Sequence, residues 1–163
     1  MKLLQKNKIE INHVSDTALW VAYYRAKESE RPDALFHDAL AKVLVGERGK
    51  IIANSMKKTG RYTEWSVISR TVIIDKFIYQ LIAEGVDLVV NLGAGLDTRP
   101  YRMNLPENLK WIEVDYPDII QFKTNLLKSE KSKCQLMHVE LDLSDIAKRN
   151  KFLSDINSQA KKF

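Results

Sequence analysis

The fold is decided by the stretch Asn91-Leu92-Gly93-Ala94-Gly95-Leu96-Asp97-Thr98-Arg99. It overlaps the end of Asp87–Leu92, a short and nearly all-apolar run that is typical of a buried parallel strand. Glycine after such a strand lets the backbone approach a ligand, because no Cβ stands in the way. In open parallel sheets, ligands bind beyond the carboxyl ends of the strands. We therefore expect an α/β fold with a binding site at this glycine-rich turn.

Strands and helices alternate on the C-terminal side of the turn. Two further strands are predicted at Trp111–Asp115 and Gln135–Asp142, and helices are predicted at 117–127 and Ile146–Ile156. Pro117 suits the first turn of a helix. This alternation indicates β-α-β units, which right-handed crossovers join into a parallel sheet. Three strands are few for such a sheet, so we expect it to be truncated after the third strand, with an open edge.

Helical patterns dominate the residues before the first strand. Three helices are predicted there: one from Ser15–Asp16 to Pro32, one over Leu35–Val45 with Gly46 just past its end, and one capped by Ser66 and ended by Gly85. Residues 47–63 show no clean period and are expected to form short helices or a loop. The predicted organisation is a helical cap over 1–65, followed by a sheet domain over 66–163.

Acidic residues end the second and third predicted strands. Asp115 lies twenty positions after Gly95 and can accept hydrogen bonds from both hydroxyls of a ribose. Asp142 ends the third strand and is expected to face the same crevice. Each signal also has a local explanation, as a plain turn or as a helix cap. Taken together, the three strand ends predict one adenosine-sized site.

The same layout suits a nicotinamide dinucleotide, whose fingerprint is Gly-x-Gly-x-x-Gly. Thr98 occupies the third glycine position in this chain. The third glycine permits close packing of helix on strand, so its absence argues against that ligand. An NAD-dependent oxidoreductase remains an alternative hypothesis.

Five motifs occur in order, and together they resemble one family. They are Ser15-Asp16-Thr17-Ala18 with Tyr24–Ser29 and Leu35–Asp38; Arg70-Thr71 with Asp75; Asn91–Arg102; Glu113–Pro117; and Leu141–Leu143. The chain resembles the leucine carboxyl methyltransferase-like family of S-adenosylmethionine-dependent O-methyltransferases, in its bacterial polyketide-type branch. The resemblance covers about residues 13 to 163, which is the N-terminal part of such proteins. A fourth strand with a Glu-Gly motif follows in the family and is not found here.

The resemblance implies a Rossmann-like class I methyltransferase fold that binds S-adenosylmethionine. It implies that Gly93, Ala94 and Gly95 contact the methionine and ribose side of the cofactor. The remaining roles that it implies are for Arg70 on the cofactor carboxylate, Asp115 on the ribose, Asp142 on the adenine amino group and the backbone of Leu143 on the ring. Arg25 is a second candidate for the carboxylate, while Arg99 and Arg102 are expected to form structural salt bridges.

The resemblance leaves the methyl acceptor open, as a carboxylate or a hydroxyl. A carboxylate needs no general base, because it is already ionised at neutral pH. No residue of this chain is named as a catalytic base. The alternative to an active enzyme is a non-catalytic fragment that associates, as a homo-oligomer, through its open sheet edge.

Composition limits the partners and the cellular location that can be expected of the chain. The 163 residues carry a net charge of +5, but the basic residues are spread along the chain, so nucleic-acid binding is not expected. No apolar run approaches the roughly 20 residues that a membrane span requires. Cys134 is the only cysteine, which excludes an internal disulfide and favours a cytoplasmic location. His13, His37 and His138 lack metal-ligand spacing, so no metal site is expected.

Overall fold

The computed structural model describes residues 14–55 and 60–159. The chain divides into two compact units whose boundary lies between Ile73 and Ile74. Three helices, α1 (Val14–Ser29), α2 (Ala39–Ser55) and α3 (Gly60–Ala83), precede the first strand, and the boundary falls inside α3. The prediction of His13 as incidental falls outside the described residues.

In the first unit, α1 and α2 pack through an apolar interface. Its buried side chains include Leu19, Ala22, Leu44, Val45, Ile52 and Ala53. The start of α2 is set by Asp38, whose buried Oδ1 accepts a hydrogen bond from the backbone N–H of Ala41 at 3.0 Å. An aspartate in this position satisfies an N–H that has no partner within the helix. The predicted start at Leu35 is therefore wrong by one helical turn, because the capping carboxylate lies at residue 38.

Gly46 divides α2 into two helical segments. Its φ of 52° and ψ of −166° are not helical, and the chain resumes helical geometry on the far side and continues to Ser55. Such dihedral angles are open almost only to glycine. The prediction that a helical segment ends just before this glycine is confirmed, since two helical segments meet at the residue.

Helix α3 begins before its predicted start. It runs from Gly60, so Ser66 lies in its interior instead of capping it. The end of the helix is as predicted, because Gly85 adopts a φ of 100° and its N–H bonds back to the carbonyl of Ile82 at 3.0 Å. A positive φ of this kind is typical of the glycine that stops a helix.

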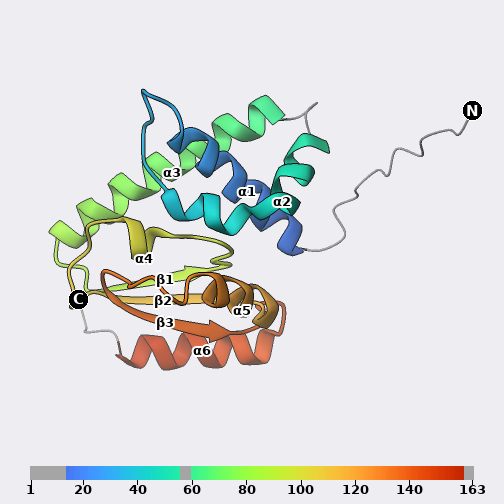
Figure 1. Ribbon diagram of the computed structural model, residues 1–163. Coiled ribbons are helices and arrows are strands. Elements are labelled where there is room, and N and C mark those ends of the chain that lie inside the picture. Colours follow the sequence, from blue (N-terminus) through green and yellow to red (C-terminus); the bar gives the residue numbers. More distant parts are fainter. Residues whose placement is uncertain (1–13, 56–59, 160–163) are drawn as a thin grey trace, which may run out of the picture. The chain divides into compact units, whose positions relative to one another are not determined.

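The second unit holds a three-stranded parallel sheet with helices between the strands (Figure 1). Its elements are β1 (Leu88–Leu92), α4 (Arg99–Arg102), β2 (Lys110–Asp115), α5 (Pro117–Leu126), β3 (Gln135–Glu140) and α6 (Ile146–Gln159). The strand order is β1-β2-β3, with Val90 opposite Ile112 and Ile112 opposite Met137. The predicted α/β fold with a parallel sheet is confirmed. Strand β3 ends two residues before Asp142, which lies in the following turn.

Successive residues of β2 point to opposite faces of the sheet and serve two cores. Trp111 joins a cluster with Met103, Leu105, Leu109 and Cys134, against which Ile78 and Ile82 of α3 pack. Ile112 and Val114 join a second cluster on the other face, which Phe152 and Ile156 of α6 cover. Figure 1 shows α6 running alongside the sheet. Both faces are therefore buried, as expected of the central strand in a parallel sheet.

Within residues 14–55 and 60–159, no helix has both the length and the apolar character that a membrane span needs. The same residues contain no grouping of histidine, cysteine and acidic side chains arranged to hold a metal ion.

Candidate functional site

The glycine-rich turn lies at the carboxyl end of β1 and folds over the tip of β2. The N–H groups of Gly93 and Ala94 both donate to the carbonyl of Val114, at 2.8 and 3.1 Å. Gly93 and Gly95 adopt φ values of 69° and 53°, which favour glycine because they place a Cβ too close to the backbone. A Cβ built on Gly93 would meet nothing within 4 Å, so the space beside this residue is open. The turn therefore presents bare backbone to an open region.

Asp115 ties the turn to the second strand tip. Its Oδ2 accepts a hydrogen bond from the backbone N–H of Gly95 at 2.6 Å, and its Oδ1 accepts one from the N–H of Tyr116 at 2.8 Å. The side chain is buried, while its backbone carbonyl accepts from the N–H of Leu141 at 2.9 Å. One residue thus joins all three strand tips. Each carboxylate oxygen has a second lone pair that a ligand hydroxyl can use.

Asp142 and Asp115 both interact with Tyr116. Its Oδ1 accepts from the N–H of Ser144 at 2.8 Å. Hydrogen bonds from Ser144 hold the pKa of Asp142 below its usual value, and the hydroxyl of Tyr116 adds to this effect. In turn, the negative charge of Asp142 raises the pKa of Tyr116. Asp142 is therefore a carboxylate acceptor at neutral pH.

Leu143 follows at the edge of the same region. Its side chain is half-buried and packs on the cluster of Ile112, Val114 and Leu141. Its carbonyl accepts a hydrogen bond from the Arg149 guanidinium at 3.2 Å. The side chain is thus part of the core that supports the tip of β3, which leaves the backbone as the part that can contact a ligand.

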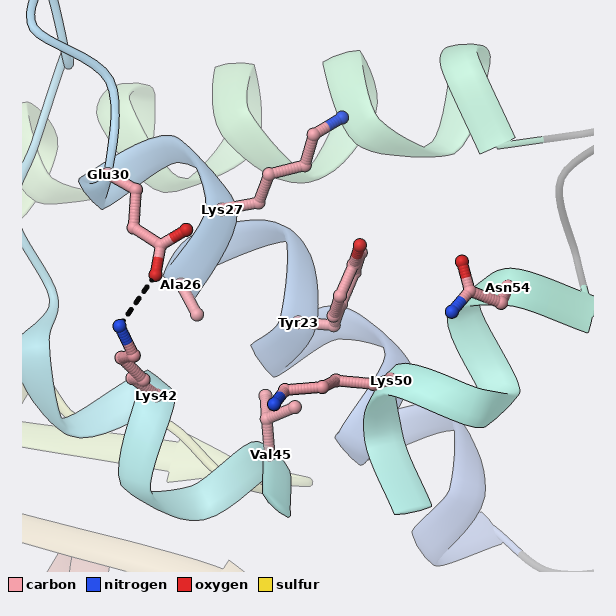
Figure 2. Close-up of a pocket in the computed structure, with 8 residues that line it drawn as sticks. All are labelled: Tyr23, Ala26, Lys27, Glu30, Lys42, Val45, Lys50 and Asn54. Atoms are coloured by element: carbon pink, nitrogen blue, oxygen red, sulfur yellow. Dashed lines mark hydrogen bonds and ion pairs between the residues drawn. The ribbon is translucent and has the colours of Figure 1, made fainter. Parts of the chain in front are cut away.

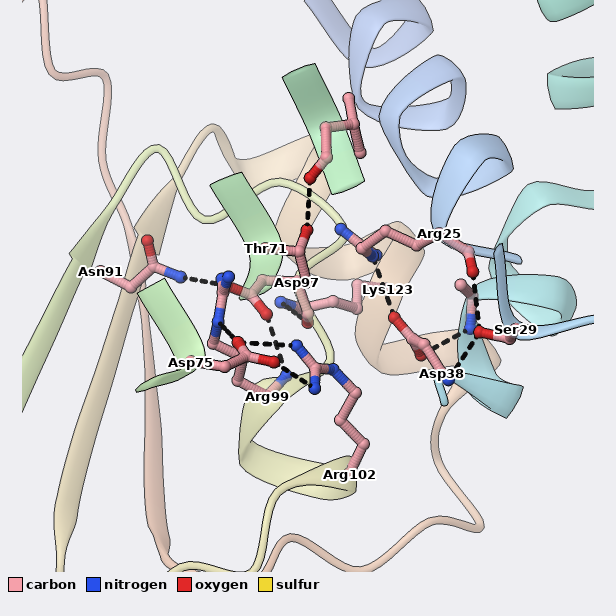
Figure 3. A network of polar contacts seen from close by, with 12 residues as sticks. Arg25, Ser29, Asp38, Thr71, Asp75, Asn91, Asp97, Arg99, Arg102 and Lys123 are labelled. Carbon is pink, nitrogen blue, oxygen red and sulfur yellow. Dashed lines mark hydrogen bonds and ion pairs between the residues drawn. The ribbon is translucent and has the colours of Figure 1, made fainter. Parts of the chain in front are cut away.

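Six of the seven residues predicted for the site lie at the strand tips of the second unit. Arg70, the seventh, belongs to the first unit and lies exposed on α3. Arg25, the second candidate for the carboxylate, is buried and donates from Nε to Asp38 at 2.9 Å (Figure 3). That pairing gives Arg25 a structural role in the first unit.

The first unit contains a separate cavity of about 340 Å³ between α1 and α2 (Figure 2). Three lysines reach its rim, but each has a carboxylate partner: Lys27 with Glu64 at 2.8 Å, Lys42 with Glu30 at 2.8 Å and Lys50 with Glu47 at 2.7 Å. Because these charges cancel, the cavity has no excess of positive charge to attract an anion. None of the predicted site residues lines it.

The whole of the described sheet and most of the helices match one family of proteins. Residues 18–157 match the leucine carboxyl methyltransferase family. The chain belongs to the leucine carboxyl methyltransferase family. This confirms the resemblance that the five motifs predicted.

Individual relatives of the family agree with the match. A protein of Streptomyces coelicolor is 36% identical over 138 residues, which cover 79% of this chain and 49% of that protein. A protein of Streptomyces avermitilis is 33% identical, over 86% of this chain and 53% of that protein. A protein of Parafrankia is 36% identical, over 81% of this chain and 46% of that protein. All three are provisionally named S-adenosyl-L-methionine-dependent methyltransferases. The chain spans about half the length of the curated relatives it matches.

An ion-pair network next to the turn holds the family's glycine motif against α3 (Figure 3). Asp75 of α3 accepts from Arg99 Nε at 2.7 Å and pairs with Arg102 NH1 at 2.7 Å. Asp97 accepts from Asn91 Nδ2 at 3.0 Å and from the N–H of Arg99 at 2.9 Å. The prediction that Arg99 and Arg102 form structural salt bridges is confirmed.

The start of α4 is held by Asp97 and not by the residue in the capping position. Thr98 holds the position before the helix and is fully buried, but its side chain makes no capping hydrogen bond. The carboxylate of Asp97 supplies that bond through the N–H of Arg99 instead.

Sequence reasoning missed a buried ion pair between β2 and α5. Lys123 Nζ lies 2.5 Å from Glu113 Oε2, and both side chains are fully buried. A signal was available, because Glu113 interrupts the apolar run of a central strand and Lys123 lies on the apolar face of α5 with Ile119, Ile120 and Leu127. Opposite charges in two buried faces indicate a pair, since an isolated buried charge is very costly.

Proposed function

We propose that this chain binds S-adenosylmethionine at the tips of β1, β2 and β3, and that it serves methyl transfer to an oxygen of an acceptor. The observation that supports it best is the 2.6 Å hydrogen bond from the Gly95 N–H to Asp115 Oδ2. It places a buried carboxylate directly at a turn of exposed backbone. An acid and a bare turn at neighbouring strand tips are what a nucleoside requires.

The residues at the strand tips fit the cofactor. Gly93 leaves open space where a side chain would stand, so a ligand can lie against the backbone. Asp115 would accept from the ribose hydroxyls and Asp142 from the adenine amino group, while the backbone of Leu143 would contact the ring. Arg70 would hold the carboxylate, since a guanidinium can bind it with two parallel hydrogen bonds. The cofactor supplies an activated methyl group that an oxygen nucleophile displaces in line.

The chain's own contribution to such a reaction is placement. A carboxylate acceptor arrives ionised and needs no proton removed. The rate then depends on orienting the nucleophile and the methyl group in a site that excludes water. A hydroxyl acceptor would need a base to take its proton. We assign no general base among the described residues and propose a carboxylate or hydroxyl acceptor, with the activity located in the cytoplasm. Buried Thr98 at the third glycine position argues against the nicotinamide alternative.

Titration calorimetry with S-adenosylhomocysteine tests the proposal. We expect saturable binding to the 163-residue chain, and a loss of about tenfold or more for Asp115→Ala, because a charge-assisted hydrogen bond contributes roughly 1.5–3 kcal/mol. Asp118→Ala is the matched control, since it removes an exposed carboxylate three residues further along the chain. Asp115→Asn separates the loss of the negative charge from the loss of the hydrogen bond to the turn, because its amide oxygen can still accept from the Gly95 N–H. Full-strength binding by Asp115→Ala would refute the site.

The second candidate is association of two copies through the edge of β1. Among the described residues, β1 pairs only with β2, and its sequence Leu-Val-Val-Asn-Leu carries no charge or proline. Natural sheets usually protect an edge with such residues. The other edge strand, β3, carries Gln135, His138 and Glu140 and is polar. Sedimentation over a range of concentrations tests this candidate, and a monomer at the highest concentration would contradict it.

A further inference from the structure

Lys123 lies in an unusual place for a lysine. It sits on α5 and its side chain is fully buried. Lysine is almost never buried unless its charge is paired, because removing an ammonium from water costs several kcal/mol. The ammonium has two partners in the second unit: Glu113 Oε2 at 2.5 Å and the backbone carbonyl of Asp97 at 3.0 Å. Figure 3 shows this lysine reaching the turn.

The carbonyl of Asp97 belongs to the glycine-rich turn, two residues after Gly95. The side chain of the same aspartate binds Asn91 and Arg99, so its carboxylate is already held from the side of β1 and α4. Lys123 holds the opposite, main-chain side of the residue. The turn is thus fastened to β1, α4 and α5 through one residue.

Glu113 keeps the ammonium where it is. This glutamate lies in β2, between the core residues Ile112 and Val114, and is itself fully buried. His138 of β3 approaches its Oε2 at 3.2 Å. The pair therefore connects the turn to β2, the buried central strand of the described sheet.

We propose that Lys123 is a positioning residue for the cofactor turn, with Glu113 as its anchor; this rests on the proposed function. A turn with two glycines has many accessible conformations, and ordering it costs entropy when a ligand binds. A buried ammonium bonded to the Asp97 carbonyl removes part of that freedom before binding. Cofactor affinity then depends on a residue that does not touch the cofactor.

The test compares Glu113→Gln with the double variant Glu113→Gln/Lys123→Met in the full chain. The single variant keeps the amine that donates to Asp97, whereas the double variant removes it and leaves no buried charge. Replacing a buried ion pair with uncharged residues of similar size often preserves stability. We therefore expect the double variant to melt no lower than the single one, so that any loss of affinity reports on the turn. Lys151→Met, on an exposed pair of α6, is the control for loss of a lysine.

Two readouts are needed. Hydrogen exchange of the Gly95 and Leu96 amides, measured without ligand, should accelerate about tenfold or more in the double variant, by less in the single variant, which loses only the anchor, and not at all in Lys151→Met. Affinity for S-adenosylhomocysteine should fall about tenfold in the double variant, by less in the single variant and not in Lys151→Met.

Unchanged exchange or unchanged affinity in the double variant would overturn the proposal, as would a double variant that does not fold, because the pair would then serve the whole fold. A wild-type chain that binds no S-adenosylhomocysteine would instead refute the proposed function, while the exchange measurement would still test the hold on the turn.

Discussion

Replacing Asp75 with alanine removes the carboxylate that joins α3 to α4. Its Oδ1 lies 2.7 Å from Arg99 Nε and 2.9 Å from Arg102 NH2, and its Oδ2 lies 2.7 Å from Arg102 NH1. All three side chains are nearly buried, at 10–13% exposure. Removing one partner of a buried ion pair typically costs about 3–5 kcal/mol, because a charge is left uncompensated. Arg99 keeps its pair with Asp97, so we expect the lower end, about 3 kcal/mol.

Urea unfolding followed by circular dichroism measures this loss. Asp155→Ala is the matched control, since Asp155 pairs with Lys151 at 2.7 Å on the surface of α6, with 56% and 77% of the two side chains exposed. Exposed pairs contribute about 0–1 kcal/mol, so the control should remain near wild type. The reasoning is refuted if Asp75→Ala unfolds within about 1 kcal/mol of Asp155→Ala, because burial would then not strengthen the network.

Three further predictions concern single side chains. Burial raises the pKa of the Cys134 thiol to about 11, so alkylation of the folded chain at pH 8 should be roughly a hundredfold slower than after unfolding, and equal rates would contradict this. The stability that depends on the protonated thiol should be lost as the pH rises from about 9 towards 11. Gly46→Ala should destabilise the chain by about 1–3 kcal/mol through backbone strain alone, whereas Glu47→Ala should change it by less than about 0.5, and equal effects would rule strain out. Asp142→Asn should lower the pKa of Tyr116 towards its ordinary value, as followed by NMR of the ring carbon that bears the hydroxyl, and an unchanged titration would show that the two groups do not interact.

Local signals predicted the sheet well because its elements have distinct periods. The three strands lie within one or two residues of their predicted bounds, since a buried parallel strand is an apolar run closed by a turn. The helices before them were placed less well. Asp38 caps α2 one turn after the predicted start, and a second helical segment follows Gly46 at once, over residues whose sequence shows no clean period.

The candidate site likewise has a part that local sequence signals predict and a part that depends on tertiary packing. Gly95 and Asp115 could be found because each follows an apolar run, and parallel strands bring such ends to one edge. The hydrogen bond between them could not be found, because it depends on the path of the turn over β2. The pairing of Lys123 with Glu113 depends in the same way on how α5 lies on the sheet.

By itself, the sequence determined the family and the parallel sheet, and it predicted the strand tips as the place of the proposed site, because these follow from short-range patterns of apolar residues, glycines and acids. Only the tertiary structure decided which charges neutralise one another: Asp75 with Arg99 and Arg102, and Glu113 with Lys123. The physical reason is distance. Coulomb and hydrogen-bond energies act over a few ångströms in space, and the chain brings those residues together only when its helices pack on its sheet.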